Sequence, residues 1–95
     1  MKSIIQSRRE CYKTKRTTDL HEHHIFYGTS NRKNSEKYGL KVYLTGEYHN
    51  LSSKGVHFNK DFDTDLKQTA QRAFEKTHGD RADFIRIFGR NYLDD

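Results

Sequence analysis

The chain has 95 residues, enough for one domain with a small core and too few for a second. Its hydrophobic fraction of 32% is lean and its charged fraction is 33%, so the six Phe and six Tyr supply much of the apolar area. No window approaches the roughly 18 apolar residues of a membrane span, and the first six residues are too short an apolar run for a signal peptide. A single cysteine, Cys11, excludes an intrachain disulfide. We therefore expect a cytoplasmic protein with no membrane partner.

The formal net charge of +5 at pH 7 favours a polyanionic partner, although many small basic proteins bind nothing anionic. Basic residues gather in the N-terminal arm and again directly after a histidine-rich stretch. If the partner is nucleic acid, we expect its phosphates to contact Arg32, Lys33 and Lys37 first, and then Arg8, Arg9 and Arg16. For each of these residues, a solvated surface charge is an equally good interpretation.

Residues 1–19 are polar and basic. Residues 1–10 form either a frayed basic arm or an irregular arm across the core, and residues 14–19 indicate a turn. Residues 20–27 alternate in polarity and predict a strand, with His21, His23 and Ile25 on one face and Glu22, His24 and Phe26 on the other. Residues 28–39 are polar and predict a loop. Residues 40–44 alternate again and predict a second strand, antiparallel to the first.

Residues 45–50 predict a turn or a short helix with Thr45 as its N-cap. The Ser-Ser-Lys-Gly run within residues 51–59 interrupts any helix there. From Asp61 onward the chain predicts a helix, because apolar residues recur every three or four positions, namely Phe62, Leu66, Ala70, Ala73 and Phe74. Gly79 stands where that helix would stop.

A final short helix is predicted from its cap, Asp80, to its C-terminal glycine, Gly89. Its apolar side carries Phe84, Ile85 and Phe88, after which Tyr92 and Leu93 could fold back onto the core. Two strands and one helix enclose little apolar surface, so the C-terminal helices are needed to complete the core. The expected fold is a small α+β domain over residues 1–95, an antiparallel hairpin plus helix with additional C-terminal helices.

Three of the six histidines, His21, His23 and His24, fall within four positions. Only neutral imidazoles cluster without charge repulsion, so such a group is expected to hold a metal ion, a proton in transit or a phosphate. His49 and His57 follow the second predicted strand and could lie close to His23 and His24. Three imidazoles suit Zn, Mn, Ni or Co better than Mg or Ca.

Adjacent histidines on a strand point to opposite faces, so one could bind metal while its neighbour transfers a proton, a division of labour useful in hydrolysis. The alternative is a set of exposed histidines with no ligand. His78, near a helix C-terminus, is interpreted only as a partner of the helix dipole.

Four segments in order carry a family resemblance: Leu-His-Glu-His-His-Ile-Phe-Tyr-Gly at 20–28, Gly-Leu-Lys-Val-Tyr-Leu-Thr at 39–45, Tyr-His-Asn at 48–50 and Gly-Val-His-Phe-Asn at 55–59. Over residues 10–93 the chain resembles small phage-type HNH endonucleases of the ββα-metal superfamily. The resemblance implies a ββα-metal finger that hydrolyses DNA at one divalent ion, which could be Mg, Mn, Ni, Co or Zn. It also implies phage packaging or recombination proteins as partners, and a monomer or a homodimer.

Carried over residue by residue, the resemblance makes His23 the first metal ligand and His24 the general base that deprotonates the attacking water. His49 matches the first histidine of the helical metal pair, and His57 matches the last ligand. The spacing between them is eight residues, whereas four is common in the family, so the intervening residues must loop out or replace a helical turn. Asn50 is the alternative ligand if the site closes without His57.

The middle Asn of the family motif, which fixes the loop that orients the base, is replaced by Leu40 at its usual position, so Asn31 or Asn34 is expected to substitute for it. Relatives that carry a structural zinc knuckle have two Cys pairs at the places matched here by Cys11, Thr14, Thr45 and Tyr48. Three of the four sulfurs are missing, so no structural zinc is expected.

Two rival interpretations remain. One is a non-catalytic HNH-like module that binds nucleic acid or metal without cutting. The other is a protein-interaction module whose histidines contact a protein partner.

Overall fold

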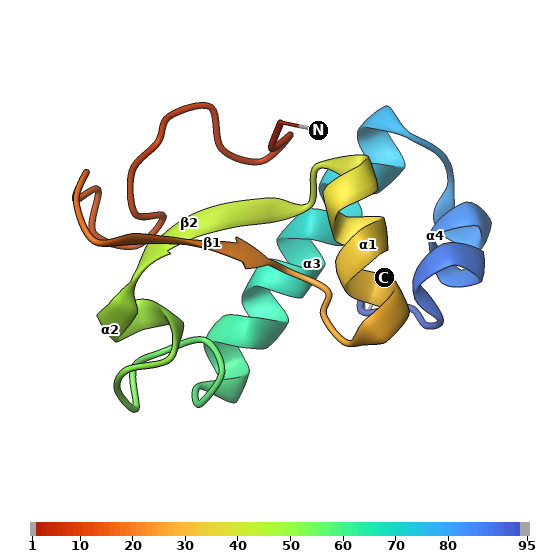
Figure 1. Ribbon diagram of the computed structural model, residues 1–95. Coiled ribbons are helices and arrows are strands. Elements are labelled where there is room, and N and C mark those ends of the chain that lie inside the picture. The colour runs from red at the N-terminus through yellow and green to blue at the C-terminus, as the bar shows by residue number, and fades with distance from the viewer. Residues whose placement is uncertain (1, 94–95) are drawn as a thin grey trace.

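In the computed structural model, which describes residues 2–93, a two-stranded antiparallel hairpin and four helices form a small α+β domain (Figure 1). The elements are β1 Leu20–His24, α1 Thr29–Tyr38, β2 Lys41–Thr45, α2 Gly46–His49, α3 Lys60–Thr77 and α4 Arg81–Phe88. This architecture is compatible with a ββα fold. No helix of the described chain combines the length and the apolar character needed to cross a bilayer.

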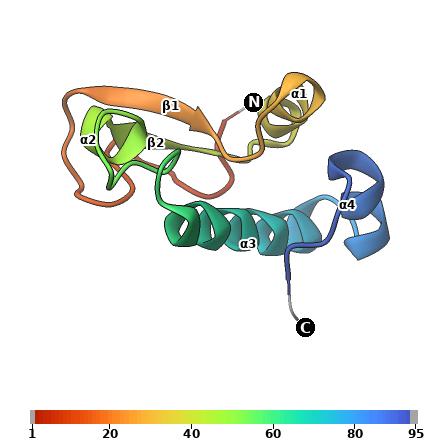
Figure 2. The same cartoon turned by 90° about the horizontal axis from the view of Figure 1, so that it is seen from below.

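The hairpin pairs β1 with β2 in a register that places Leu20 opposite Thr45 and His24 opposite Lys41. One face carries two cross-strand pairs, His21 with Leu44 and His23 with Val42, and α3 runs along the hairpin (Figure 2). The other face carries Glu22 with Tyr43 and His24 with Lys41. The predicted alternation of the two strands is therefore confirmed, although β1 ends at His24, before Ile25 and Phe26 enter the core.

The sequence-based prediction of a loop over residues 28–39 is wrong, because Thr29–Tyr38 forms the helix α1. Gly28 precedes it, and Gly39 ends it in the left-handed conformation with φ of 72°. Only Ser35 is buried on this helix, where its hydroxyl accepts a hydrogen bond from the Phe26 amide and donates one to the Phe26 carbonyl. Apart from the Tyr38 ring, which packs against Phe74 and Phe88, the helix docks through polar groups, so it lacks the apolar periodicity that identifies a helix in a sequence.

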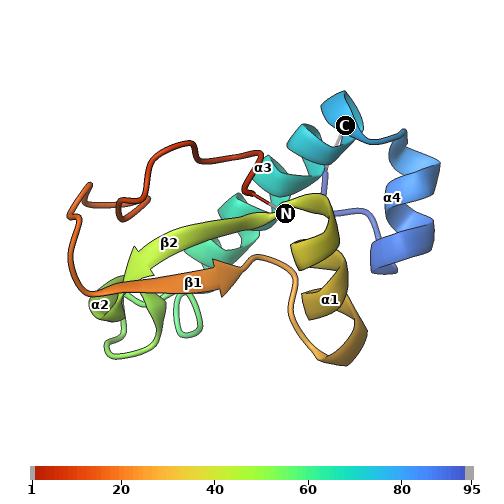
Figure 3. The ribbon, with the colours of Figure 1, turned by 45° about the horizontal axis from the view of Figure 1, so that its top comes forward.

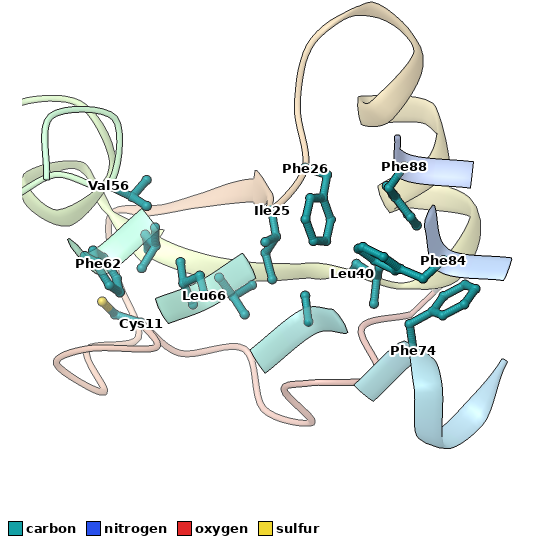
Figure 4. Close-up of a cluster of buried hydrophobic side chains, with 13 residues drawn as sticks. Cys11, Ile25, Phe26, Leu40, Val56, Phe62, Leu66, Phe74, Phe84 and Phe88 are labelled. Atoms are coloured by element: carbon teal, nitrogen blue, oxygen red, sulfur yellow. The ribbon is translucent and has the colours of Figure 1, made fainter. Parts of the chain in front are cut away.

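The core is largely aromatic at the end formed by α1, α3 and α4 (Figure 4). The rings of Phe26, Phe74, Phe84 and Phe88 pack in T-shaped, tilted and stacked pairs with centroids 4.7–6.1 Å apart. Toward the other end, Leu66 and Cys11 are fully buried. The five buried Phe residues, Phe26, Phe62, Phe74, Phe84 and Phe88, thus compensate for the low aliphatic content of the chain.

The predicted helix boundaries near the C-terminus agree with the structure. Asn59 caps α3 by accepting a hydrogen bond from the Phe62 amide, and α3 ends at Thr77, two residues before Gly79. Asp80 and Asp83 form a reciprocal capping box at the start of α4, and Gly89 ends α4 in the left-handed conformation. Leu93 folds back and is buried.

The N-terminal arm follows β2 instead of fraying (Figure 3). The Ile4 amide donates to the Gly39 carbonyl at 2.9 Å, and the Ser3 hydroxyl donates to the Lys41 carbonyl at 2.6 Å. The Tyr12 amide donates to the Tyr43 carbonyl, and the Tyr43 amide donates to the side-chain oxygen of Gln6, each at 2.8 Å. The arm therefore covers the outer edge of β2, an edge that would otherwise expose unpaired backbone groups.

Candidate metal centre

Three histidines from three different segments meet on the α3 side of the hairpin. His23 lies in β1, His49 is the last residue of α2, and His57 lies in the loop before α3. One ring nitrogen from each lies within 4.8 Å of the other two. The Nε2 atoms of His49 and His57 are 3.2 Å apart, and the His23 ring centroid lies 5.3 and 5.2 Å from those of His49 and His57.

His23 has a buried polar atom without a partner. Its side chain is 2% exposed, and its Nε2 has no hydrogen bond within the described part of the chain. Leaving such a group unsatisfied costs about 1–3 kcal/mol. A cation bound by the three rings would satisfy it.

The spacing of the nitrogens fits such an ion. Two Zn–N bonds of about 2.0–2.1 Å at a tetrahedral angle hold their nitrogens about 3.3 Å apart. The observed 3.2 Å between the Nε2 atoms of His49 and His57 is close to that value. Three nitrogen donors from separate elements leave further coordination positions free, which is the arrangement of catalytic sites.

The environment keeps two of these rings neutral. Burial is the main reason that the pKa of His23 falls to about 3, and the nearby rings of His49 and His57 lower it further. Burial also lowers the pKa of His49 to about 4, with contributions from His57 and His21. Metal ligation requires the neutral imidazole, so both rings are in the ligating state at neutral pH.

These lowered pKa values predict that the metal-free protein loses stability in acid. Below about pH 6.5 the unfolded chain protonates these rings, whereas folded His23 resists protonation down to about pH 3. The unfolded state then binds more protons, so the free energy of unfolding falls as the pH drops from about 6.5. Urea unfolding between about pH 6.5 and 5 should show this slope, and His23→Leu should flatten it.

Glu36 adds a slope of the same sign, but at lower pH. Its pKa is held below the usual 4.5, so its contribution is lost only as the pH falls below about 4.5. The range above pH 5 therefore isolates the histidines. An equal slope in wild type and His23→Leu would contradict the assignment of this acid sensitivity to His23.

His57 reaches the centre because the chain between α2 and α3 doubles back. The Val56 amide donates to the Tyr48 carbonyl at 2.7 Å, and the His57 amide donates to the His49 carbonyl at 3.3 Å. A Cβ atom at Gly55 would lie 2.8 Å from the His49 carbonyl oxygen, so this close return requires glycine. The long spacing is absorbed by the excursion of residues 50–55, so the group of three histidines closes with His57, the condition under which Asn50 is not needed as the alternative ligand.

His24 lies on the opposite face of the hairpin from this group. Its Nε2 is 2.9 Å from Glu36 Oε1 and 3.8 Å from a Glu22 oxygen. Lys41 Nζ lies 3.0 and 2.9 Å from the two Glu36 oxygens. The hydrogen bond with His24, and then that with Lys41, hold the pKa of Glu36 well below its usual range. The Glu22, His24 and Glu36 ligand atoms also lie within 4.8 Å of one another, but the Lys41 ammonium already pairs with both carboxylates.

The two asparagines expected to help orient the base make other contacts. The side-chain amide of Asn31 donates to the Phe88 carbonyl at 3.3 Å, and the side-chain amide of Asn34 donates to the Ile87 carbonyl at 3.2 Å. Both therefore tie α1 to the end of α4. The side chain that hydrogen-bonds to His24 is Glu36. Its role was not predicted, because residues 28–39 were expected to form a loop.

A second group missed in the sequence lies beside the three histidines. The Tyr27 ring packs 5.2 Å from His57 and 6.0 Å from His23, measured between centroids. The Tyr27 hydroxyl donates to Asp63 at 3.4 Å, and Lys67 pairs with Asp63 at 2.8 Å while lying 4.6 Å from the Tyr27 ring centroid. The only sign of this group in the sequence was the four-residue spacing of Asp63 and Lys67, which places the two side chains on one helix face.

The predicted nucleic-acid contacts divide into two sets. Arg32 and Lys33 line a groove of about 460 Å³ with His24 and Glu36. Arg8 and Arg9 line a neighbouring groove of about 750 Å³, which also includes Lys41. Both grooves include Glu22, so these four basic residues border the hairpin face that carries His24. Arg16 and Lys37 lie outside these grooves, where Arg16 contacts Thr18 and Lys37 covers the Tyr38 ring.

Three of the four positions considered above for a structural zinc, Cys11, Thr14 and Thr45, lie together. The Thr45 amide donates to Cys11 Sγ at 3.4 Å, and the Thr45 hydroxyl lies 3.9 Å from that sulfur. Burial raises the pKa of the Cys11 thiol, but hydrogen bonds with Thr14 and Thr45 outweigh it and bring the pKa to about 7. Tyr48, the fourth matched position, faces the Phe62 ring at 6.5 Å.

Compared with protein-family models, with curated proteins and with solved structures, the chain has no match.

Proposed function

We propose that this chain is a metal-dependent DNA endonuclease of the HNH type, with a ββα-metal finger formed by the hairpin, α2 and the start of α3. The observation that carries the proposal is the buried, unpartnered Nε2 of His23 beside the ring nitrogens of His49 and His57. A structural role alone gives no reason to bury an unsatisfied imidazole among two others. The convergence of Cys11, Thr14 and Thr45 supports the family register independently.

In this proposal His23, His49 and His57 hold one divalent cation. The bound ion would stabilise negative charge on the phosphate and on the departing oxygen. His24 acts as the general base. If its Nε2–H donates to Glu36, as the 2.9 Å contact allows, its Nδ1 carries the lone pair that takes a proton from water. Glu36 then fixes the tautomer of the base, as a carboxylate does for a catalytic histidine.

Arg8, Arg9, Arg32 and Lys33 are proposed to contact phosphates that flank the scissile one, because the scissile phosphate itself must reach the three-histidine group on the other hairpin face. Phosphate contacts of this kind carry no sequence information but supply affinity that falls with salt. One metal centre and one base per chain cut one strand. A monomer would therefore nick, and a double-strand break would require a homodimer or two events, with partner proteins of phage packaging or recombination as the proposed setting.

The test is nicking of supercoiled plasmid by the purified protein with Mn²⁺, Mg²⁺, Ni²⁺, Co²⁺ or Zn²⁺. We expect conversion to the open circular form with at least one of these ions, and none after the ion is chelated. Chelation removes the cation but leaves the basic grooves, so DNA retardation at low salt should persist. Cleavage that is unaffected by chelation would contradict a metal-dependent mechanism.

The second candidate is an HNH-like module that binds metal and nucleic acid without cutting. It is favoured by the position of His24, which lies on the opposite hairpin face from the three-histidine group and contacts Glu36. The plasmid experiment separates the two, because DNA binding without nicking under every ion would support the module.

A further inference from the structure

A fourth histidine extends the candidate metal centre outward. His21 lies on the same hairpin face as His23, and its Nδ1 is 3.0 Å from Nδ1 of His49. His49 therefore uses its two ring nitrogens in two directions. Its Nε2 faces His57 at 3.2 Å, and its Nδ1 faces His21.

The chemistry of the ring decides the tautomers along this line. A His49 that binds metal through Nε2 must carry its proton on Nδ1. That N–H then donates to His21 Nδ1, which must be the acceptor, so the His21 proton lies on Nε2. The Nε2–H of this neutral His21 ring faces Asp19 Oδ1, and the two heavy atoms are 3.7 Å apart, which is longer than a hydrogen bond.

Asp19 is itself held by the element that carries the ligand. Its other carboxylate oxygen accepts a hydrogen bond from the Gly46 amide at 3.3 Å, at the first residue of α2. His49 is the last residue of α2, so Asp19 and His21 contact the two ends of the same short helix. Ligands whose second nitrogen is fixed in this way bind metal more tightly, because ring orientation and tautomer are set in advance.

We propose that His21 is a positioning residue, which accepts a hydrogen bond from the Nδ1–H of His49 so that His49 presents Nε2 to the metal. The inference rests on the metal centre of the proposed function. It assigns His21 a role outside the ligand set. His21 does not touch the ion in this arrangement, since its Nδ1 faces the nitrogen of His49 that points away from His57.

Three substitutions distinguish an acceptor from a space-filling ring. In His21→Asn, the side-chain oxygen can take the place of Nδ1 and accept the same proton. In His21→Gln, the amide extends one methylene further, to the place of Nε2, and in His21→Leu the acceptor is lost while bulk remains. Zn²⁺ titration by calorimetry into the metal-free protein should show about 10–100-fold weaker binding for the Leu and Gln variants. The Asn variant should bind more tightly than both.

Thermal melting of the metal-free variants provides the structural control. His21 is half-buried, so all three substitutions should shift the melting temperature to a similar extent. The Zn²⁺ affinity of each variant, in contrast, should depend on whether its side chain has a hydrogen-bond acceptor at the place of Nδ1. Equal Zn²⁺ affinity in wild type and all variants would overturn the inference. So would an Asn variant as weak as the Leu variant, a result that would instead make His21 a direct ligand.

The wild-type protein separates this inference from the function on which it rests. If wild type binds Zn²⁺ with the expected order of variants but never nicks plasmid, the endonuclease proposal fails and the positioning role stands. If wild type binds Zn²⁺ and nicks while the His21 variants bind normally, only the positioning role fails. If wild type binds none of the tested cations, both fail.

Discussion

Replacing His23 by alanine is expected to abolish both metal binding and DNA cleavage. His23 is the buried member of the three-histidine group, and its Nε2 has no hydrogen-bond partner among residues 2–93. The loss of affinity should exceed the roughly 10–100-fold typical of an outer contact, because a direct ligand is removed. Calorimetric titration with Zn²⁺ and Mn²⁺, together with plasmid nicking, measures the two effects.

Two further variants guard this prediction against simple misfolding. His57 is exposed, so His57→Ala removes a ligand without opening a cavity, and we expect it to weaken metal binding and cleavage as well. His78→Ala is the matched control, because His78 contacts the Tyr38 carbonyl and is not in the three-histidine group. A folded His23→Ala protein that binds metal as wild type does would exclude the proposed centre.

Replacing His24 by alanine should separate the two effects: cleavage is lost, whereas metal binding is retained. Removing a general base costs about 10²–10⁴-fold in rate. Metal affinity should hardly change, because His24 points away from the three ligands, toward Glu36 and Lys41. Initial nicking rates under saturating metal, compared with the calorimetric dissociation constant, separate the two quantities.

Glu36→Gln is the graded control for His24. The glutamine oxygen can still accept a hydrogen bond from the His24 ring, but the negative charge that stabilises a protonated imidazole is gone. We therefore expect a smaller loss of rate than in His24→Ala, with DNA binding maintained. If His24→Ala nicks plasmid as fast as wild type, another group is the base.

Several features were predictable because they depend only on neighbours along the chain. The two-residue period of a strand predicts that His23 and His24 face apart, whatever they contact. The caps of α4 follow from Asp80 and Gly89, which act within a few residues of their own positions. The long helix α3 follows from its apolar spacing.

Other features depend on contacts that the chain pattern does not encode. Helix α1 has one buried residue, Ser35, and docks through asparagine and serine hydrogen bonds and the single ring of Tyr38, so no apolar stripe marked it. Its formation moved Asn31 and Asn34 toward α4 and brought Glu36 to His24. When a helix is mistaken for a loop, the directions of its polar side chains cannot be predicted, and neither can their contacts.

The sequence by itself determined the hairpin, the long helix and the list of histidines able to bind a metal. The tertiary structure alone decided which of them meet. His57 joins His49 across eight residues because the loop returns to the carbonyls of α2, and His21 meets His49 because β1 lies beside that helix. The reason is physical: alternation and helical period fix directions within one element, whereas distances between elements are set by packing and by backbone hydrogen bonds that link residues far apart in the chain.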